Sequence, residues 1–150
     1  MSTVAVRVVE WAEAQRDIRS IRKAVFIEEQ GVPAELDLDD LDRDCLHVLA
    51  CDEQGQPIGT ARMREDGKIG RMAVLKPRRG RGVGRALLQA LLKEAGRRRL
   101  SLVYLASQIQ EIGFYEKHGF QITGDIFLDA SIPHRNMTLK LLLNSKHRYP

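Results

Sequence analysis

Apolar and polar positions along this chain follow two different spacings, which divide it into predicted strands and helices. The first apolar run, Val4–Val9, is rich in β-branched residues and predicts a strand. Apolar residues then recur at helical spacing, at Ile18, Ile21, Val25 and Phe26. Because charged residues fill the positions between them, we expect an amphipathic helix over 12–29, ended by Gly31 and Pro33.

The remaining chain alternates short apolar runs with turn signals. Strands are predicted over 45–51, 57–64, 68–75, 102–106, 120–123 and 136–143, and helices over 82–98 and 109–117. The turns at 52–55 and 66–67 predict hairpins in the first half, and the second half predicts a strand–helix–strand crossover. The segment 34–44 alternates Leu with Asp or Glu and predicts an acidic loop or short helical turn. The interleaving indicates an α/β fold, a mixed sheet with helices on both faces.

Length and composition bound the class of protein. With 150 residues, 43% of them apolar, we expect one domain with a core over about 4–143 and a polar tail over 144–150. No apolar stretch approaches the roughly 20 residues of a membrane span, and no secretory signal pattern is present, so we expect a cytoplasmic protein. No group of Cys and His has zinc-site spacing, and we therefore expect no metal.

The segment Arg78–Gly84, Arg-Arg-Gly-Arg-Gly-Val-Gly, lies between a predicted strand and a predicted helix. A glycine-rich turn at a helix start offers free backbone N–H groups to phosphate, and the helix dipole favours negative charge there. Arg79, Arg81 and Arg85 add positive charge with a geometry suited to phosphate oxygens. A P-loop would continue with Lys and a hydroxyl residue after Gly84, and a dinucleotide loop would space its glycines differently. The sequence therefore predicts a different pyrophosphate-bearing ligand.

Two blocks in this order resemble the GNAT superfamily of N-acetyltransferases. Arg79-x-x-Gly82-x-Gly84 is similar to the superfamily's Gln/Arg-x-x-Gly-x-Gly/Ala loop, and 114–120 (Phe-Tyr-Glu-Lys-His-Gly-Phe) to its Phe-Tyr-x-x-x-Gly-Phe segment. The chain most resembles a branch of small GNAT proteins of uncertain substrate. The segments that carry this likeness are 25–30, 32–33, His47, Gly59-x-x-Arg62, 68–74 and 132–134. The likeness covers about 6–142. It implies a mostly antiparallel, splayed sheet of about six or seven strands, with acetyl-CoA held in the split.

The resemblance assigns cofactor-binding residues. Backbone groups of Met72, Ala73 and Val74 are expected beside the pantetheine arm, with an N–H near Val74 facing the thioester oxygen. The N–H groups expected around the pyrophosphate belong to Arg79, Gly80, Arg81, Gly82, Val83 and Gly84, with Arg85 close by. Lys117 is expected near the phosphate end. Ala106 stands where many relatives carry Asn, and Gln108 or Ser107 is the candidate replacement.

The resemblance also names Tyr115 as the general acid that protonates the departing thiolate, because relatives commonly place a tyrosine beside the sulfur there. A phenol with a pKa near ~10 is suited to that step, and the alternative is an aromatic that only packs. The general base stays open among Glu28, Glu29, His134 and His47. The first two end the predicted helix that borders the acceptor cleft, and His134 follows Pro133 in a predicted loop.

Charge is distributed unevenly along the chain. Eight acids and one base lie in 28–44, whereas nine bases and one acid lie in 76–99. The basic run matches a phosphate-rich ligand, and no nucleic-acid partner is expected because no aromatic residue lies in that run to stack on bases. The acidic stretch suggests a cationic acceptor, and the alternative is a solvated loop that aids solubility. The resemblance to GNAT proteins implies direct acetyl transfer from acetyl-CoA to an amine. The alternative is a non-catalytic acyl-CoA-binding sensor; the oligomeric state stays open, with a homodimer as one option.

Overall fold

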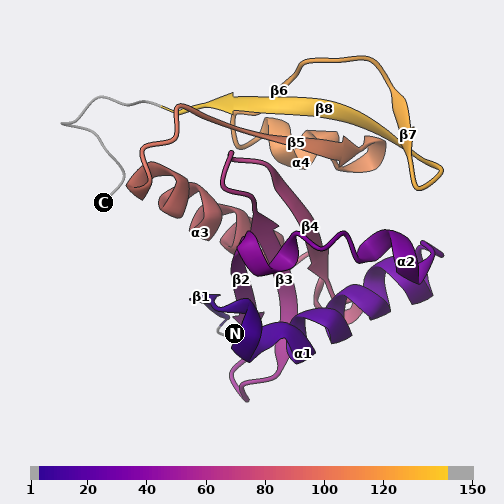
Figure 1. Cartoon of the computed structure of the whole chain (residues 1–150), viewed down its shortest axis with the longest axis vertical. Helices are drawn as coiled ribbons and strands as arrows, with labels where there is room; N and C mark the ends of the chain where they lie inside the picture. The colour runs from indigo at the N-terminus through magenta and orange to yellow at the C-terminus, as the bar shows by residue number, and fades with distance from the viewer. Residues whose placement is uncertain (1–3, 142–150) are drawn as a thin grey trace.

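The computed structural model describes residues 4–141, which form two antiparallel sheets (Figure 1). The first sheet has the order β1 (Ala5–Val9), β2 (Leu46–Cys51), β3 (Pro57–Met63) and β4 (Ile69–Val74). In the second, β8 (Ile132–Lys140) lies between β5 (Leu102–Gln108) and β6 (Gln121–Ile122), and β7 (Phe127–Asp129) also pairs with β8. The predicted α/β fold with a splayed, mostly antiparallel sheet is confirmed.

The two sheets meet at one point, next to the β3–β4 hairpin. Lys68 and Tyr104 form an isolated parallel bridge, and the Tyr104 N–H donates to the Gly67 carbonyl at 3.1 Å. Within 4–141 no further pairing joins β4 to β5, so the edge of β4 beyond Lys68 is left without a strand partner. That unpaired edge includes Met72, Ala73 and Val74.

The helical segments connect these strands. They are α1 (Trp11–Arg22), η1 (Lys23–Glu29), α2 (Ala34–Asp37), η2 (Asp42–Asp44), η3 (Lys76–Arg78), α3 (Val83–Arg97), η4 (Ile109–Glu111) and α4 (Ile112–Glu116). The predicted first helix continues to Glu29, but its last part is a π-helix, η1, a wide turn that often marks functional sites. No helix in the described part of the chain is long and apolar enough to cross a bilayer.

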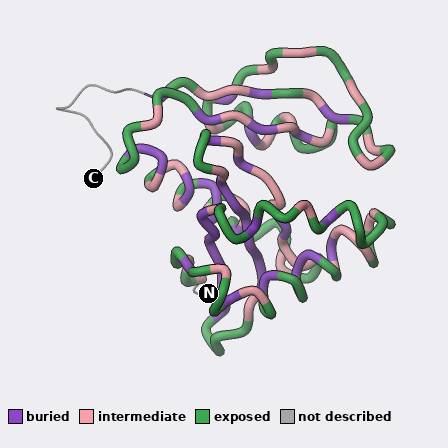
Figure 2. Tube along the Cα trace, in the orientation of Figure 1, coloured by how far each residue is buried: buried purple, intermediate pink, exposed green. Residues whose placement is uncertain are grey.

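Helices α1 and α3 cover opposite faces of the first sheet, and the side chains of β2 alternate between them. Val48 and Ala50 belong to the apolar cluster with α3, whereas Leu49 packs in the cluster with Ile18 and Ile21 of α1. Since β2 is buried on both faces, its apolar residues follow one another from Val48 to Cys51 instead of alternating with polar ones. Figure 2 shows this layer as the most continuously buried part of the chain.

Two boundaries in the second sheet differ from the prediction. Strand β8 begins at Ile132, four residues before the predicted start, so His134 lies in a strand and not in a loop. Pro133 signalled a loop, but a proline near the start of a strand is tolerated. Strand β7 was not predicted, because three residues are too few to show a period. The predicted end of the last strand, 142–143, and the tail 144–150 lie outside the described residues.

Replacing Gly67 with Ala should lower the free energy of unfolding substantially. Gly67 has φ 96°, and a Cβ there would lie 2.8 Å from the backbone oxygen of Leu102. The strain and the clash together should cost about 2–4 kcal/mol, measured by urea unfolding. Gly55→Ala is the matched control, because Gly55 also has positive φ but nothing within 4 Å of the added Cβ. Equal losses in both variants would show that the close approach of the two sheets is unimportant.

Candidate active site

The backbone of the glycine-rich loop at the start of α3 is shaped to accept an anion, and we call residues 80–84 the cradle. Gly80 and Gly82 have φ of 77° and 84°, and a Cβ at either position would meet nothing within 4 Å. Glycine is therefore required there by backbone conformation and not by crowding. The backbone N–H groups over 80–84 have no hydrogen-bond partner within 4–141. With the 15-residue helix behind them, they present a row of donors and a positive dipole end to an anion.

The arginines around this cradle have different partners. Arg79 binds both carboxylate oxygens of Glu29, at 2.6 and 2.7 Å, and its Nε donates to the Val74 carbonyl at 2.9 Å. Arg78 pairs with Asp52 at 2.8 Å. Arg81 and Arg85 are exposed and have no ion pair among the described residues. The side chains free to meet an anion are therefore those of Arg81 and Arg85, whereas the Arg79 guanidinium ties the loop to η1.

A bulge interrupts β4 just before the predicted pantetheine-binding residues. Thr60 lies opposite Ala73 and Arg62 opposite Gly70, so β4 has one more residue than β3 between these pairs. Arg71, within the bulge, has φ 50°, an unusual value for a residue with a side chain. Bulges redirect the backbone that follows them. This bulge therefore sets the orientation of Met72 to Val74 on the unpaired edge of β4.

Tyr115 lies against both the bulged strand and the loop. Its hydroxyl lies 3.7 Å from the Met72 sulfur, and its neighbour Phe114 comes within 3.6 Å of the position of a Cβ on Gly84. Burial raises the pKa of Tyr115, so the phenol stays protonated at neutral pH. The structure thus brings together Tyr115, Met72 and the start of α3, three positions that lie far apart in the sequence.

Other predicted cofactor residues lie at the two ends of this region. Gln108, at the end of β5, donates to the Gln30 side chain at 3.1 Å, whereas the Ser107 hydroxyl donates to the backbone at Gln108. Gln108 is therefore better placed than Ser107 to meet a ligand. Lys117 is exposed at the end of α4. Its neighbour His118 contacts the ring of Phe114, which in turn lies beside Gly84, so this end of α4 is near the cradle. Burial and the charge of Arg85 lower the pKa of His118.

The two glutamates at the end of η1 differ in their contacts. Both line a hollow of about 350 Å³ formed with Leu75, Lys76 and Pro77 after β4. The hydrogen bond from Arg79 lowers the pKa of Glu29, which makes that carboxylate a weaker base. Glu28 is exposed and forms no ion pair with another residue of 4–141, so it is the freer of the two carboxylates.

The two candidate histidines differ more sharply. His134 lies opposite Gln108, its ring stacks on Phe127, and its Nδ1–H donates to the Ile132 carbonyl at 2.7 Å. This leaves Nε2 as a proton acceptor. His47 is fully buried on the α1 side, stacked on Trp11, and its Nε2–H donates to the Asp42 carbonyl at 2.8 Å. His47 therefore supports the fold and lies apart from the other candidates.

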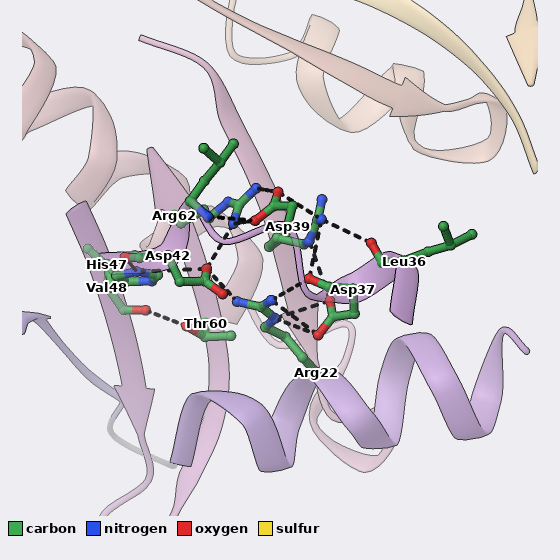
Figure 3. A network of polar contacts seen from close by, with 11 residues as sticks. Arg22, Leu36, Asp37, Asp39, Asp42, His47, Val48, Thr60 and Arg62 are labelled. Atoms are coloured by element: carbon green, nitrogen blue, oxygen red, sulfur yellow. Dashed lines mark hydrogen bonds and ion pairs between the residues drawn. The ribbon is translucent and has the colours of Figure 1, made fainter. Parts of the chain in front are cut away.

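The acidic segment is held in place by a buried network of charges (Figure 3). This network was not predicted from the sequence. Arg22 is completely buried and binds Asp37, at 3.2 Å from Nε to each oxygen, and Asp42 at 2.9 Å. Arg62 of β3 binds Asp39 and Asp42. The signal was the position of Arg22 within the apolar stripe of its helix, next to Ile21 and four residues from Ile18, where a charge must find buried partners.

Arg71 extends this network to the bulge of β4. Its Nη2 lies 3.1 Å from the Asp39 carboxylate and 3.4 Å from the carbonyl oxygens of Leu36 and Asp37. The segment 34–41 is therefore attached directly to the strand residue that precedes Met72. Asp37 and Asp39 of this segment, together with Asp42 just after it, are paired with arginines, whereas Glu35, Asp40 and Asp44 stay exposed.

The network predicts a loss of stability at acidic pH. Hydrogen bonds from Arg62 hold the pKa of Asp39 far below its usual range. At Asp42 burial raises the pKa, but the hydrogen bonds and charges of Arg22 and Arg62 outweigh burial and lower the pKa overall. Because both pKa values fall on folding, the stabilisation is complete above the unfolded value of about 4 and is lost as pH falls below it. The free energy of unfolding, measured by urea titration at several pH values, should decline below about pH 4.

Asp39→Asn should weaken that decline, whereas Asp40→Asn should not. Asp40 is the exposed neighbour, and its φ of 61° suits asparagine, so this control removes one carboxylate without disturbing the network. Identical acid dependence in the parent and in Asp39→Asn would contradict the assignment of the effect to the buried ion pairs.

The geometry just described agrees with comparisons to known proteins. The family model "Acetyltransferase (GNAT) domain" matches residues 15–141. The chain belongs to the GNAT acetyltransferase family. It is 39% identical over 129 residues to the "Uncharacterized N-acetyltransferase YjcF" of Bacillus subtilis, covering 83% of this chain and 91% of that protein. The resemblance stated from the loop and the Phe-Tyr block is thereby confirmed, as is the general class of acyl-transferring enzymes.

Solved structures of other proteins share this fold over most of the chain. A crystal structure of an acyl-CoA N-acyltransferase from Pseudomonas aeruginosa is similar with a TM-score of 0.80 at 28% identity, covering 91% of this chain and 99% of that one. Escherichia coli ElaA gives a TM-score of 0.81 at 25% identity, with the same coverage. The fold in which β4 and β5 separate is therefore one that this chain shares with these proteins.

Proposed function

We propose that the protein transfers an acetyl group from acetyl-CoA directly to an amine of a cationic acceptor. The observation that carries this proposal is the row of unpartnered N–H groups over 80–84, which begins a long helix beside the unpaired edge of β4. A cradle for pyrophosphate next to a free strand edge suits a ligand with a phosphate end and an extended amide-bearing arm. Arg81 and Arg85 add charge on the exposed side.

The residues present fit each part of such a donor. The strand edge at Met72 to Val74 offers backbone donors and acceptors to the arm, although Arg79 already occupies the Val74 carbonyl. The donor supplies an acetyl thioester, whose carbonyl carbon accepts the amine nitrogen. Gln108, a candidate replacement for the asparagine that many relatives carry at the position of Ala106, lies at the end of β5 and donates to Gln30.

The chemistry requires two proton movements that this chain can supply. An ammonium acceptor first gives up one proton to a base, and the neutral nitrogen then forms a bond to the carbonyl carbon as the carbon–sulfur bond breaks. The departing sulfur takes the Tyr115 hydroxyl proton, and the second nitrogen proton returns to Tyr115 through water. Glu28 and His134 are the candidates for the base, because Glu29 is held by Arg79 and His47 lies away from the site.

Binding of the donor should be lost when the cradle is distorted. Gly82→Ala forces a side chain onto a residue with φ 84°, so the loop must rearrange its N–H groups. Isothermal titration with acetyl-CoA should show micromolar binding to the parent and at least about tenfold weaker binding to Gly82→Ala. Gly55→Ala, which places an equal strain in the distant β2–β3 turn, should bind as the parent does. No binding by the folded parent would overturn the proposal.

A further inference from the structure

Large exposed apolar side chains gather on three segments of this protein. Among the described residues eight such side chains are exposed, and six of them fall into this group: Leu36, Leu38, Leu41, Ile109, Ile126 and Leu128. Val8 in β1 and Leu102 at the start of β5 are the other two. Leu128 is 70% exposed and Ile126 62%, values that are unfavourable for isolated side chains with nothing to cover them. We call the segments 34–41, 109–112 and 124–131 the acceptor rim.

The three parts of the rim lie at the same end of the molecule. Gln30, which precedes the first segment, is bonded to Gln108, which precedes the second. Gln108 in turn lies opposite His134, and His134 stacks on Phe127 in the third segment. Figure 1 shows α2, the end of β5 and β7 on the right-hand side, and Figure 2 shows exposed stretches there.

The rim lies next to the strand edge where transfer is proposed to occur. Arg71 donates to the Leu36 carbonyl and binds Asp39, which fixes the first segment to the residue before Met72. The buried Arg22 of α1 also binds Asp37 of the same segment. The leucines are therefore presented on a rigid support and not on a loose loop, so that an approaching ligand does not have to order them.

The charge of the rim has one sign. Its exposed charged residues are Glu35, Asp40, Glu111, Asp125 and Asp129. Neither Lys nor Arg occurs in any of the three segments. A surface that combines carboxylates with exposed leucines is complementary to a ligand that combines cationic and apolar groups. A small polyamine has only short methylene chains between its charges, and it would leave most of the six apolar side chains uncovered.

We propose that the acceptor is the side-chain amine of a lysine in a peptide segment where leucine-like residues flank the lysine and a further basic residue follows. This inference rests on the proposed acetyl transfer and specifies its substrate class. The carboxylates of the rim bind the additional cation, and the leucines cover the apolar side chains on either side of the reacting lysine.

The test compares three acceptors under identical acetyl-CoA concentration. They are a blocked Leu-Lys-Leu-Arg peptide, a blocked Ser-Lys-Ser-Arg peptide and spermidine, with acetylated product quantified by mass spectrometry. The kcat/KM for the Leu-flanked peptide should exceed that for the Ser-flanked one by roughly tenfold or more. In the Leu36→Ser/Leu128→Ser double variant this preference should fall close to one. The Val8→Ser/Leu102→Ser variant, which removes the exposed apolar residues outside the rim, should keep the parent's preference.

Each contrary outcome has a distinct meaning. A parent that acetylates spermidine best, or both peptides equally, overturns the substrate class and leaves acetyl transfer standing. A parent that binds acetyl-CoA but acetylates none of the three overturns both. Light scattering is measured on the parent and the rim variant as well. If the rim variant converts a dimer to a monomer without changing the peptide preference, the leucines serve a second copy of the chain and the inference is wrong.

Discussion

Replacing Arg22 with Met should lower the free energy of unfolding by about 3–5 kcal/mol, the cost of removing one partner of a buried ion pair. Arg22 is fully buried, and its loss leaves the carboxylates of Asp37 and Asp42 with fewer partners in the interior. For a domain of this length each kcal/mol corresponds to roughly 2–4 °C in melting temperature. Calorimetry or thermal unfolding followed by circular dichroism would measure the change.

Two further variants make the Arg22 result specific. Arg16→Met changes an exposed arginine of the same helix and should alter stability by no more than about 0.5 kcal/mol. Arg22→Lys keeps the charge but loses the planar fork that binds two carboxylates, so its stability should lie between those of the parent and Arg22→Met. If Arg22→Met were no less stable than Arg16→Met, the network would not be what holds the acidic segment in place.

Replacing Tyr115 with Phe should reduce kcat by about a hundredfold or more, the contribution typical of a positioned general acid. Affinity for acetyl-CoA should stay unchanged, since within residues 4–141 the hydroxyl's single polar contact is the Met72 sulfur at 3.7 Å. Release of free thiol measures the rate, and titration measures the affinity. Because burial raises the pKa of Tyr115, the parent's rate should show no fall from tyrosine ionisation up to about pH 10.

The control for this result is Tyr104→Phe. Tyr104 donates to Asp66 near the hairpin and lies outside the candidate site, so its replacement should leave the rate unchanged. Equal rates in the parent and Tyr115→Phe would show that Tyr115 only packs against Phe114 and Phe120. A parent that binds acetyl-CoA without turnover would instead support a non-catalytic acyl-CoA-binding module.

The order of elements was predictable because most of them carry a clear period. Strand β2 and helix α3 begin and end within about one residue of the ranges that their apolar positions indicate. The start of β8 was predicted too late in the chain, because Pro133 locally signals a loop. Its pairing with β7, which makes this residue part of a strand, depends on contacts that the local sequence does not show. The π-helix η1 was not foreseen either, because the same apolar spacing fits an α-helix.

The candidate site was predictable where it depends on local backbone and not where it depends on distant partners. The cradle over 80–84 follows from glycines that need positive φ beside a helix start. The partner of Arg79 lies 50 residues away at Glu29, and nothing in the loop motif indicates that pairing. The partners of Arg71 and Arg62 in the acidic segment are equally remote, so the attachment of that segment to β4 could only be found from the structure.

The most direct test of the proposed acetyl transfer is to follow both products at once. The protein would be incubated with isotopically labelled acetyl-CoA and a lysine-containing peptide, and mass spectrometry would quantify labelled amide and free coenzyme A. We expect one labelled amide for each coenzyme A released, with both rates reduced together in Tyr115→Phe. Release of coenzyme A without labelled amide, or no reaction by a protein that binds acetyl-CoA, would contradict the proposed function.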